Sequence, residues 1–201
     1  MRDLRRMKEV YFHRELLSKN PSFLQVGATS TDLALCFLEN HPAGRAAICE
    51  PDPETFWRLK SADRLQLVNC GMSGNDGVVS FWRVKDKPCA NSLTKPSQHP
   101  EATRTMVHVS RPAAILDMLG WAPDKTRGIG AVDLLALDCE GAERQIIPFL
   151  FPQGFRQVWL EWHVSWGYYN NETRGELAGK MISAGYEMYV DPGNLNYALF
   201  Y

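Results

Sequence analysis

The feature that most constrains the fold of this 201-residue chain is a series of short apolar runs separated by stretches with helical spacing. The apolar runs are 23–27, 45–50, 65–70, 131–138 and 157–162. Apolar runs of this length, bounded by turn residues or charges, are typical of strands that are covered on both faces. The stretches with helical spacing are 32–40, 53–60, 112–119, 142–150 and 171–184. This alternation predicts an α/β fold in which helices sandwich a parallel sheet.

Three further segments interrupt or extend this alternation. The segments 77–84 and 105–110 are predicted to be extra strands around a polar loop at 85–104, which we expect to be a mobile excursion. Residues 185–201 predict two strands around the turn sequence Asp191-Pro192-Gly193-Asn194. Residues 1–20 have the apolar spacing of an amphipathic helix with a basic, solvated face. Without repeats or linkers, the sequence predicts a single domain over 1–201, with this N-terminal helix and an α/β core over 22–201.

Composition excludes several classes of function. A hydrophobic share of 45%, a charged share of 22% and a net charge of −1 describe a soluble globular protein rather than a disordered, membrane or polyanion-binding one. We expect a cytoplasmic protein, because no apolar run reaches the length of a membrane span and charges interrupt the first ten residues. The five cysteines have no C-x-x-C spacing, which argues against disulfide or zinc frameworks. The near-neutral net charge argues against a nucleic-acid partner, and the N-terminal basic residues suit a solvated helix face.

Polar residues follow the first three predicted strands, where an open parallel sheet binds its ligands. Gly27 would let the backbone approach a ligand closely, and the next helix would offer free N–H groups. Glu50 lies 23 residues further on, where nucleoside-binding folds hydrogen-bond ribose hydroxyls, although a solvated loop acid is an alternative. The segment 70–72 could flank an adenine ring, and a plain turn explains it equally well. The dinucleotide fingerprint G-x-G-x-x-G is absent, which argues against a nicotinamide or flavin enzyme.

Acidic residues follow the fourth and fifth predicted strands. In "VDLLALDCEGAERQ" three carboxylates, Asp138, Glu140 and Glu143, follow a buried run, and in "LEWHVSW" strand alternation puts Glu161 and His163 on one side. If these strands are neighbours, Asp138, Glu140, Glu161 and His163 converge. A cationic ligand, a metal ion or a substrate proton awaiting removal would each suit this group. Alternatively, acids here only begin a helix, and for Glu143 we prefer this interpretation.

In order and spacing, several segments together resemble FkbM-type S-adenosylmethionine-dependent methyltransferases. They are "FLQVGATS", "ICEPDPETFWRL", "LVNCGMSGNDGVVSFW", "NSLT", "VDLLALDCEGAERQII" and "VWLEWH". The resemblance spans about residues 22–200, and its most specific parts are "CEPDP" and the D-x-E-G-A-E run that begins at Asp138. It implies the Rossmann-like three-layer sandwich of class I methyltransferases, with a mostly parallel seven-stranded sheet whose C-terminal strand is antiparallel.

The resemblance also implies roles for individual residues. Gln25, Gly27, Ala28 and Thr29 would hold the methionine part of S-adenosylmethionine, and Asp138 would sit beside its sulfonium and the substrate. The remaining cofactor-binding residues would be Glu50, Pro51 and Asp52 at the ribose, Cys70, Gly71 and Met72 at the adenine, and Ser92 near the active site. The family normally has an acid at the position of Gln25 and a glycine at that of Thr31, so Gln25 offers the cofactor's ammonium an acceptor without an opposite charge.

The expected reaction is methylation of a hydroxyl on a sugar or small natural product. The candidate bases are His163 and Asp138, with Glu161 orienting the histidine or holding the small-molecule or glycan substrate. A divalent cation on Asp138, Glu140 and Glu161 is a less favoured variant, so we expect no metal. The aromatic residues Trp162, Trp166, Tyr168 and Tyr169 could stack on a ring or only pack. A non-catalytic binding module on the same fold is the alternative function.

Overall fold

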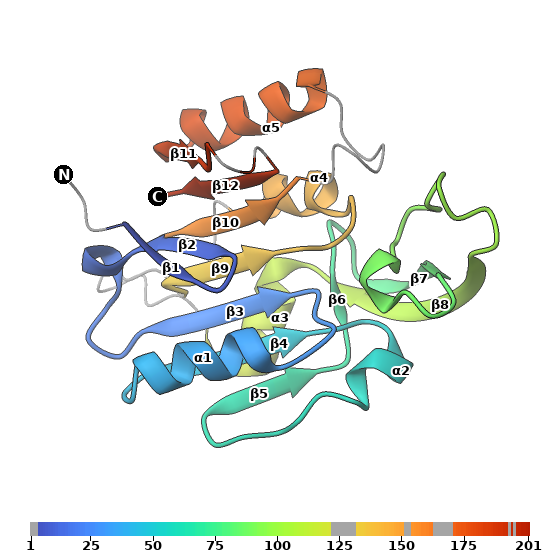
Figure 1. Ribbon diagram of the computed structural model, residues 1–201, viewed down its shortest axis with the longest axis horizontal. Coiled ribbons are helices and arrows are strands. Elements are labelled where there is room, and N and C mark those ends of the chain that lie inside the picture. Colours follow the sequence, from blue (N-terminus) through green and yellow to red (C-terminus); the bar gives the residue numbers. More distant parts are fainter. Residues whose placement is uncertain (1–3, 122–131, 151–153, 163–170, 193, 195) are drawn as a thin grey trace.

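A seven-stranded central sheet forms the body of the protein (Figure 1). The computed structural model describes residues 4–121, 132–150, 154–162, 171–192, 194 and 196–201. The strands, in spatial order, are β11 (Met188–Val190), β12 (Tyr197–Phe200), β10 (Val158–Glu161), β9 (Leu134–Leu137), β3 (Ser22–Val26), β4 (Arg45–Cys49) and β5 (Leu65–Val68). Five of them, β10 to β5 in that order, are parallel, and β12 is antiparallel to both β10 and β11. The predicted α/β sheet with an antiparallel C-terminal strand is therefore confirmed.

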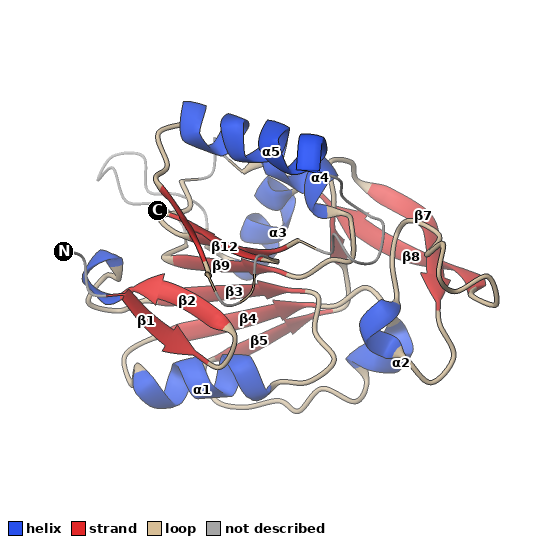
Figure 2. Ribbon diagram, turned by 45° about the horizontal axis from the view of Figure 1, so that its top comes forward, coloured by secondary structure: helices blue, strands red, loops and turns tan. Residues whose placement is uncertain are grey.

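Both faces of the sheet are covered, which explains why its central strands are apolar throughout (Figure 2). On one face α1 (Asp32–Asn40) packs Phe37 against Phe23 of β3, in a cluster that also contains Trp159. On the other face lie α3 (Pro112–Leu119), α4 (Glu143–Ile146) and α5 (Asn171–Ser183). The short helices η3 (Ile147–Phe149) and α2 (Pro53–Phe56) follow α4 and β4 along the chain. The arrangement is a three-layer sandwich.

The predicted N-terminal amphipathic helix over 1–20 is wrong. The described part of this segment is a hairpin of β1 (Leu4–Met7) and β2 (Val10–His13), followed by the short helix η1 (Arg14–Leu16). Val10 and Phe12, two residues apart in β2, are buried against the same sheet face as α1, while Tyr11 between them is only half-buried. Packing of this alternating pair on the sheet therefore decides the local structure, and the apolar spacing of three from Leu4 to Val10 fits the hairpin as well as it fits a helix.

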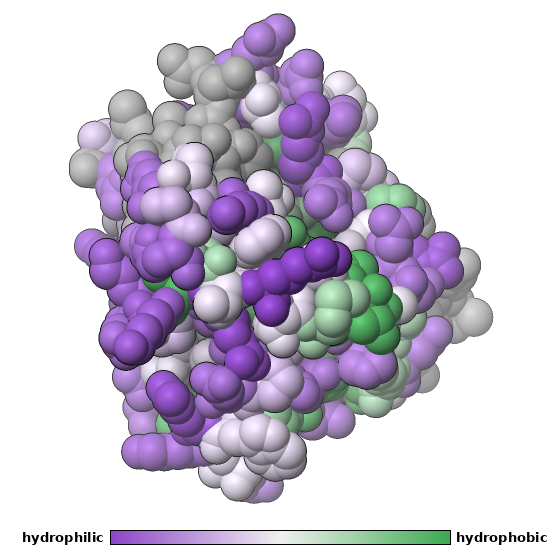
Figure 3. Space-filling view, turned by 90° about the vertical axis from the view of Figure 1, so that its right-hand side faces the viewer, coloured by the Kyte–Doolittle hydropathy of each residue, from purple (hydrophilic) through white to green (hydrophobic). Residues whose placement is uncertain are grey.

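A second, three-stranded sheet lies beside the carboxyl ends of the central strands (Figure 1). It consists of β6 (Gly71–Met72), β8 (Thr103–Ser110) and β7 (Gly77–Arg83), which confirms the two additional strands expected from the sequence. The connection at 85–104, expected to be a mobile excursion, folds back on β7: it contains the short helix η2 (Pro88–Ala90), and Ser92 exchanges two backbone hydrogen bonds with Trp82. Hydrophilic side chains cover most of this side of the molecule (Figure 3).

Within the described ranges, no helix combines the length and apolar content that a membrane crossing requires.

Candidate active site

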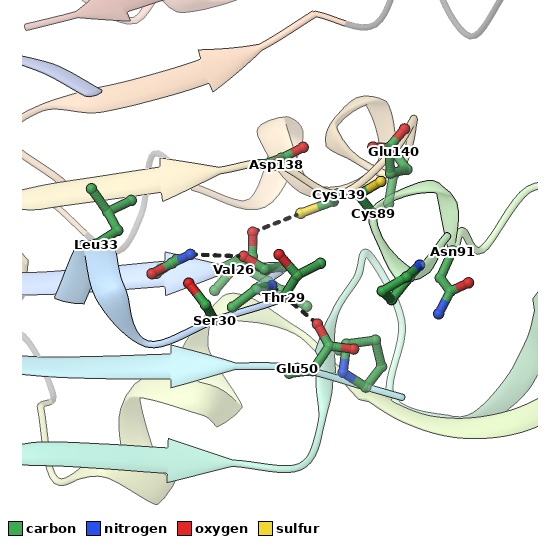
Figure 4. Close-up of a pocket in the computed structure, with 18 of the residues that line it drawn as sticks. Val26, Thr29, Ser30, Leu33, Glu50, Cys89, Asn91, Asp138, Cys139 and Glu140 are labelled. Carbon is green, nitrogen blue, oxygen red and sulfur yellow. Dashed lines mark hydrogen bonds between the residues drawn. The ribbon is translucent and has the colours of Figure 1, made fainter. Parts of the chain in front are cut away.

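The carboxyl ends of β3, β4 and β9 open onto one cavity of about 220 Å³ (Figure 4). Ten residues singled out from the sequence line it: Gln25, Gly27, Ala28, Thr29, Glu50, Pro51, Gly71, Met72, Asp138 and Glu140. Three separate strand exits, marked by Gly27, Glu50 and Asp138, thus meet in one place, as expected for a parallel sheet. Thr31, which stands where the family normally has a glycine, is buried and is not among the described residues that line the cavity.

Gly27 allows the first loop to touch the end of β9. Its φ of +82° lies in the region that favours glycine, and a Cβ there would be 1.9 Å from the backbone oxygen of Asp138. The backbone N–H of Gly27 donates to the carbonyl of Cys49 at 3.0 Å, and that of Asp138 donates to the carbonyl of Val26 at 3.1 Å. Any side chain at position 27 would therefore push apart the two strands that form the floor of the cavity.

Glu50 ties the first loop to the second strand exit. Its carboxylate accepts hydrogen bonds from the backbone N–H groups of Ala28, at 3.0 Å, and Asp52, at 2.7 Å, and only 6% of the residue is exposed. Burial raises the pKa of Glu50 to about 7, helped by the charges of Asp52 and Asp138 and opposed by the two backbone hydrogen bonds. A ligand whose hydroxyl groups donate hydrogen bonds to Glu50, or which brings positive charge into the cavity, would stabilise the ionised form of this carboxylate.

Gln25 presents an unused acceptor. Its Nε2 donates to the carbonyl of Gly27 at 3.2 Å, which assigns the opposite side of the amide to oxygen. That oxygen, Oε1, is buried and has no hydrogen-bond partner among the described residues. Because Gln25 lines the cavity, a ligand N–H group or ammonium is the kind of donor that would satisfy it.

The D-x-E-G-A-E run forms a tight loop held by its last acid. Glu143 is fully buried, and its carboxylate accepts hydrogen bonds from the backbone N–H groups of Cys139, at 2.6 Å, and Gly141, at 3.0 Å. Glu140 adopts a φ of +51°, and its carbonyl accepts the Ser92 hydroxyl at 2.6 Å. Glu143 thus begins α4, as expected, and also fixes the loop that follows Asp138.

Cys139, in the same loop, lines the cavity as an inert thiol. Burial, together with the charges of Glu143, Asp138, Glu50 and Glu140, raises its pKa well above the ordinary value.

Three predicted cofactor-binding residues lie behind the cavity wall. Asp52 is 2% exposed and forms an ion pair with Arg83 of β7, while its carboxylate also accepts from Asn91 Nδ2 at 3.2 Å. It therefore joins the rim of the cavity to the three-stranded sheet. Cys70 is buried and points its Sγ to the carbonyl of Gly71, and Ser92 supports the loop at Glu140. None of the three is among the described residues that line the cavity, and their predicted roles at the cofactor stay predictions.

Glu161 ends β10 opposite Tyr197 of β12 and is not among the described residues that line the cavity. Burial raises the pKa of Tyr197, and the charges of Glu161, Glu9 and Asp138 raise it further, so these carboxylates lie around one phenol. The proposed base His163 lies outside the described residues, as do Trp166, Tyr168 and Tyr169. Trp162 is 2% exposed and packs edge-on against Phe200, which favours its packing role.

In the described part of the chain, no group of three His, Cys, Asp or Glu residues could hold a metal ion. Asp138 and Glu140 line the cavity, whereas Glu161, the third member of the less favoured cation site, does not.

Sequence reasoning missed two parts of the cavity wall. The hairpin turn supplies Lys8 and Glu9, whose segment carries no turn signal and was predicted to be a helix face. The segment 77–104 supplies the second part, which consists of Phe81, Pro88, Cys89, Asn91 and Leu93. The apolar alternation around Phe81 predicted the strand β7 but did not show that this strand packs beside the cavity.

Comparison with known proteins agrees with this geometry. The model of the methyltransferase FkbM domain matches residues 25–188. The 2-O-methyltransferase NoeI of Sinorhizobium fredii (strain NBRC 101917 / NGR234) is 25% identical over 153 residues, which cover 67% of this chain and 61% of that protein. The chain therefore spans about three-fifths of the length of this curated relative.

Two solved structures are similar over 92% of this chain. The precorrin-6y C5,15-methyltransferase of Geobacter metallireducens GS-15 has a TM-score of 0.48 and 11% identity, with 81% of its own chain covered. The pyocyanin biosynthetic protein PhzM has a TM-score of 0.40 and 15% identity, with 51% of its chain covered. Because the family model matches most of the chain, and the sheet and its strand exits have the expected arrangement, this protein belongs to the methyltransferase FkbM domain family.

Proposed function

We propose that this protein is an S-adenosylmethionine-dependent methyltransferase that methylates a hydroxyl oxygen on a sugar or small natural product. The observation that carries the proposal is the single cavity shared by Gly27, Glu50 and Asp138, which come from three different strand exits. The 2-O-methyltransferase named among its relatives supports oxygen as the accepting atom. The resemblance to FkbM-type enzymes supports a sugar or natural-product hydroxyl.

The chemistry of the cavity wall fits this cofactor from end to end. Glu50 would accept hydrogen bonds from the ribose hydroxyls, since its carboxylate is already held in place by two backbone N–H groups. Near the other end, the buried and unsatisfied Oε1 of Gln25 would accept a hydrogen bond from the ammonium. Met72, Phe81 and Leu93 supply apolar surface suited to the adenine ring.

Bound S-adenosylmethionine supplies a methyl group that its sulfonium has already activated. The protein therefore has to hold the acceptor oxygen in line with that methyl, exclude water and take the hydroxyl proton. Asp138 is proposed to take or orient this proton, because it lies at the end of β9 and lines the cavity. Glu161, at the end of β10, and His163, two residues later in the sequence, are proposed to hold the substrate or share the role of base.

Calorimetric titration with S-adenosylhomocysteine tests the cofactor assignment. We expect wild-type protein and the surface variant Glu39→Gln to bind, and Glu50→Ala to lose most of its affinity, because Glu39 is exposed on α1 and Glu50 lines the cavity. Absence of heat at millimolar ligand would favour the alternative, a non-catalytic binding module. A second assay, with labelled cofactor and a panel of glycans and phenols, tests the acceptor: transfer to nitrogen or carbon acceptors alone would contradict O-methylation.

A further inference from the structure

The turn of the N-terminal hairpin forms part of the cavity wall. It consists of Lys8 and Glu9 alone, because Met7 of β1 pairs directly with Val10 of β2, and both turn residues line the cavity. The turn is not a free loop tip: Met7 and Val10 on either side of it are buried in the core cluster beneath α1. Arg6 Nε also donates to the carbonyl of Lys8 at 2.5 Å.

Lys8 keeps a side chain where glycine is the default residue. Its φ of +53° lies in the left-handed region, which two-residue hairpin turns usually fill with glycine or asparagine. Residues held in such conformations cluster at ligand clamps, where the surroundings over-determine them. The Lys8 ammonium lies 3.5 Å from a carboxylate oxygen of Asp32, the first residue of α1. The cation is thus held beside the loop that joins β3 to α1.

The charges of the cavity wall are unequally distributed. Among the described lining residues the carboxylates are Glu9, Glu50, Asp138 and Glu140, and Lys8 is the only cationic side chain. A ligand that carries a carboxylate would therefore meet one cationic side chain among the described lining residues. Gln25, on β3, offers an acceptor without charge, so a negative charge to pair with a ligand ammonium has to come from elsewhere in the wall.

We propose that the hairpin turn binds the charged amino-acid end of the cofactor, with Glu9 pairing with its ammonium and Lys8 with its carboxylate. This inference rests on the proposed function. It makes Glu9 the replacement for the acid that the first strand lacks at Gln25. The turn is a binding element for the cofactor and takes no part in the transfer of the methyl group itself.

The test compares three ligands by calorimetry. They are S-adenosylhomocysteine, its deamino analogue, which keeps the carboxylate but lacks the ammonium, and 5′-methylthioadenosine, which lacks the whole amino-acid end. We expect Glu9→Gln to weaken S-adenosylhomocysteine about tenfold or more, as loss of a charge-assisted hydrogen bond does, and to leave the other two ligands unchanged. Lys8→Gln should weaken both ligands that carry a carboxylate and leave 5′-methylthioadenosine unchanged. Glu39→Gln is the matched control for loss of an exposed carboxylate.

The outcomes separate this inference from the proposed function. If the wild-type protein binds none of the three ligands, the proposed function fails and the inference fails with it. If the wild type binds S-adenosylhomocysteine and both turn variants bind it as tightly as Glu39→Gln does, the inference alone is overturned. Equal losses for all three ligands would also overturn it, because the turn would then act on the nucleoside or on folding. Thermal unfolding of each variant identifies the latter case.

Discussion

Replacing Glu50 with glutamine is expected to stabilise the protein at pH 8 while weakening cofactor binding. The pKa of about 7 against an ordinary 4.5 means that the ionised, buried carboxylate destabilises the ligand-free fold by about 3 kcal/mol. Because the folded-state pKa is raised, the fold is most stable when Glu50 is protonated. This stability is fully present below pH 4.5 and is lost as pH rises to about 7. Glutamine removes the charge but can accept from only one of the two backbone N–H groups, which costs about 1 kcal/mol.

The assay is urea unfolding of wild type and Glu50→Gln at pH 5 and pH 8, followed by tryptophan fluorescence. The difference in unfolding free energy between the two proteins should change by about 2 to 3 kcal/mol between these pH values, in favour of the variant at pH 8. Groups common to both proteins cancel in this difference, and Glu39→Gln should show a change of only a few tenths of a kcal/mol. A difference that is independent of pH, or a variant that is less stable at pH 8, would refute the argument. In the wild type, affinity for S-adenosylhomocysteine should rise with pH through about 7.

Three further outcomes follow from backbone contacts around the cavity. Gly27→Ala should destabilise the protein by about 3 kcal/mol or more in urea unfolding, because a left-handed φ is combined with a backbone clash at 1.9 Å. Gly185→Ala, at φ +97° in open space, is the control and should cost only about 1 kcal/mol. Equal losses for the two variants would show that the clash at position 27 is relieved. Glu143→Gln should cost about 1 to 3 kcal/mol, since one of two partly buried N–H groups loses its acceptor, and an unchanged urea midpoint would contradict this. Ser92→Ala should lower stability by about 1 kcal/mol through its bond to the Glu140 carbonyl and weaken cofactor binding, while a full loss of folding would show that Ser92 has a larger structural role.

The sheet and its strand exits were predictable because their signals are local. Residues 134–137 are entirely apolar, which is the composition expected of a central strand in a parallel sheet that is covered on both faces. Each of the residues Gly27, Glu50 and Asp138 follows a different one of these strands. In adjacent parallel strands all three lie at the same edge of the sheet, so the strand order alone was enough to predict that they share a cavity.

The walls of the cavity were not predictable, because they depend on contacts between distant segments. Lys8 and Glu9 reach the site through a hairpin whose turn contains neither glycine nor asparagine, and whose apolar residues fit a helix equally well. Asp52 resembles a ligand-binding acid in sequence, yet Arg83 and Asn91, about 30 to 40 positions later, draw it into an ion pair and hydrogen bonds behind the rim. No local pattern reports such a partner.

The pairing of β3 with β9 also has a consequence for how this molecule is synthesised. Phe23 and Leu134 lie side by side in the central sheet although more than a hundred residues separate them, so the contact between Gly27 and Asp138 forms only after β9 has left the ribosome. A nascent chain that stops before β9 lacks Asp138, Cys139 and Glu140 and therefore has only part of the cavity wall. A ligand of this cavity would therefore stabilise, by mass action, only chains synthesised beyond β9, and shorter nascent chains would be left to chaperones and proteases.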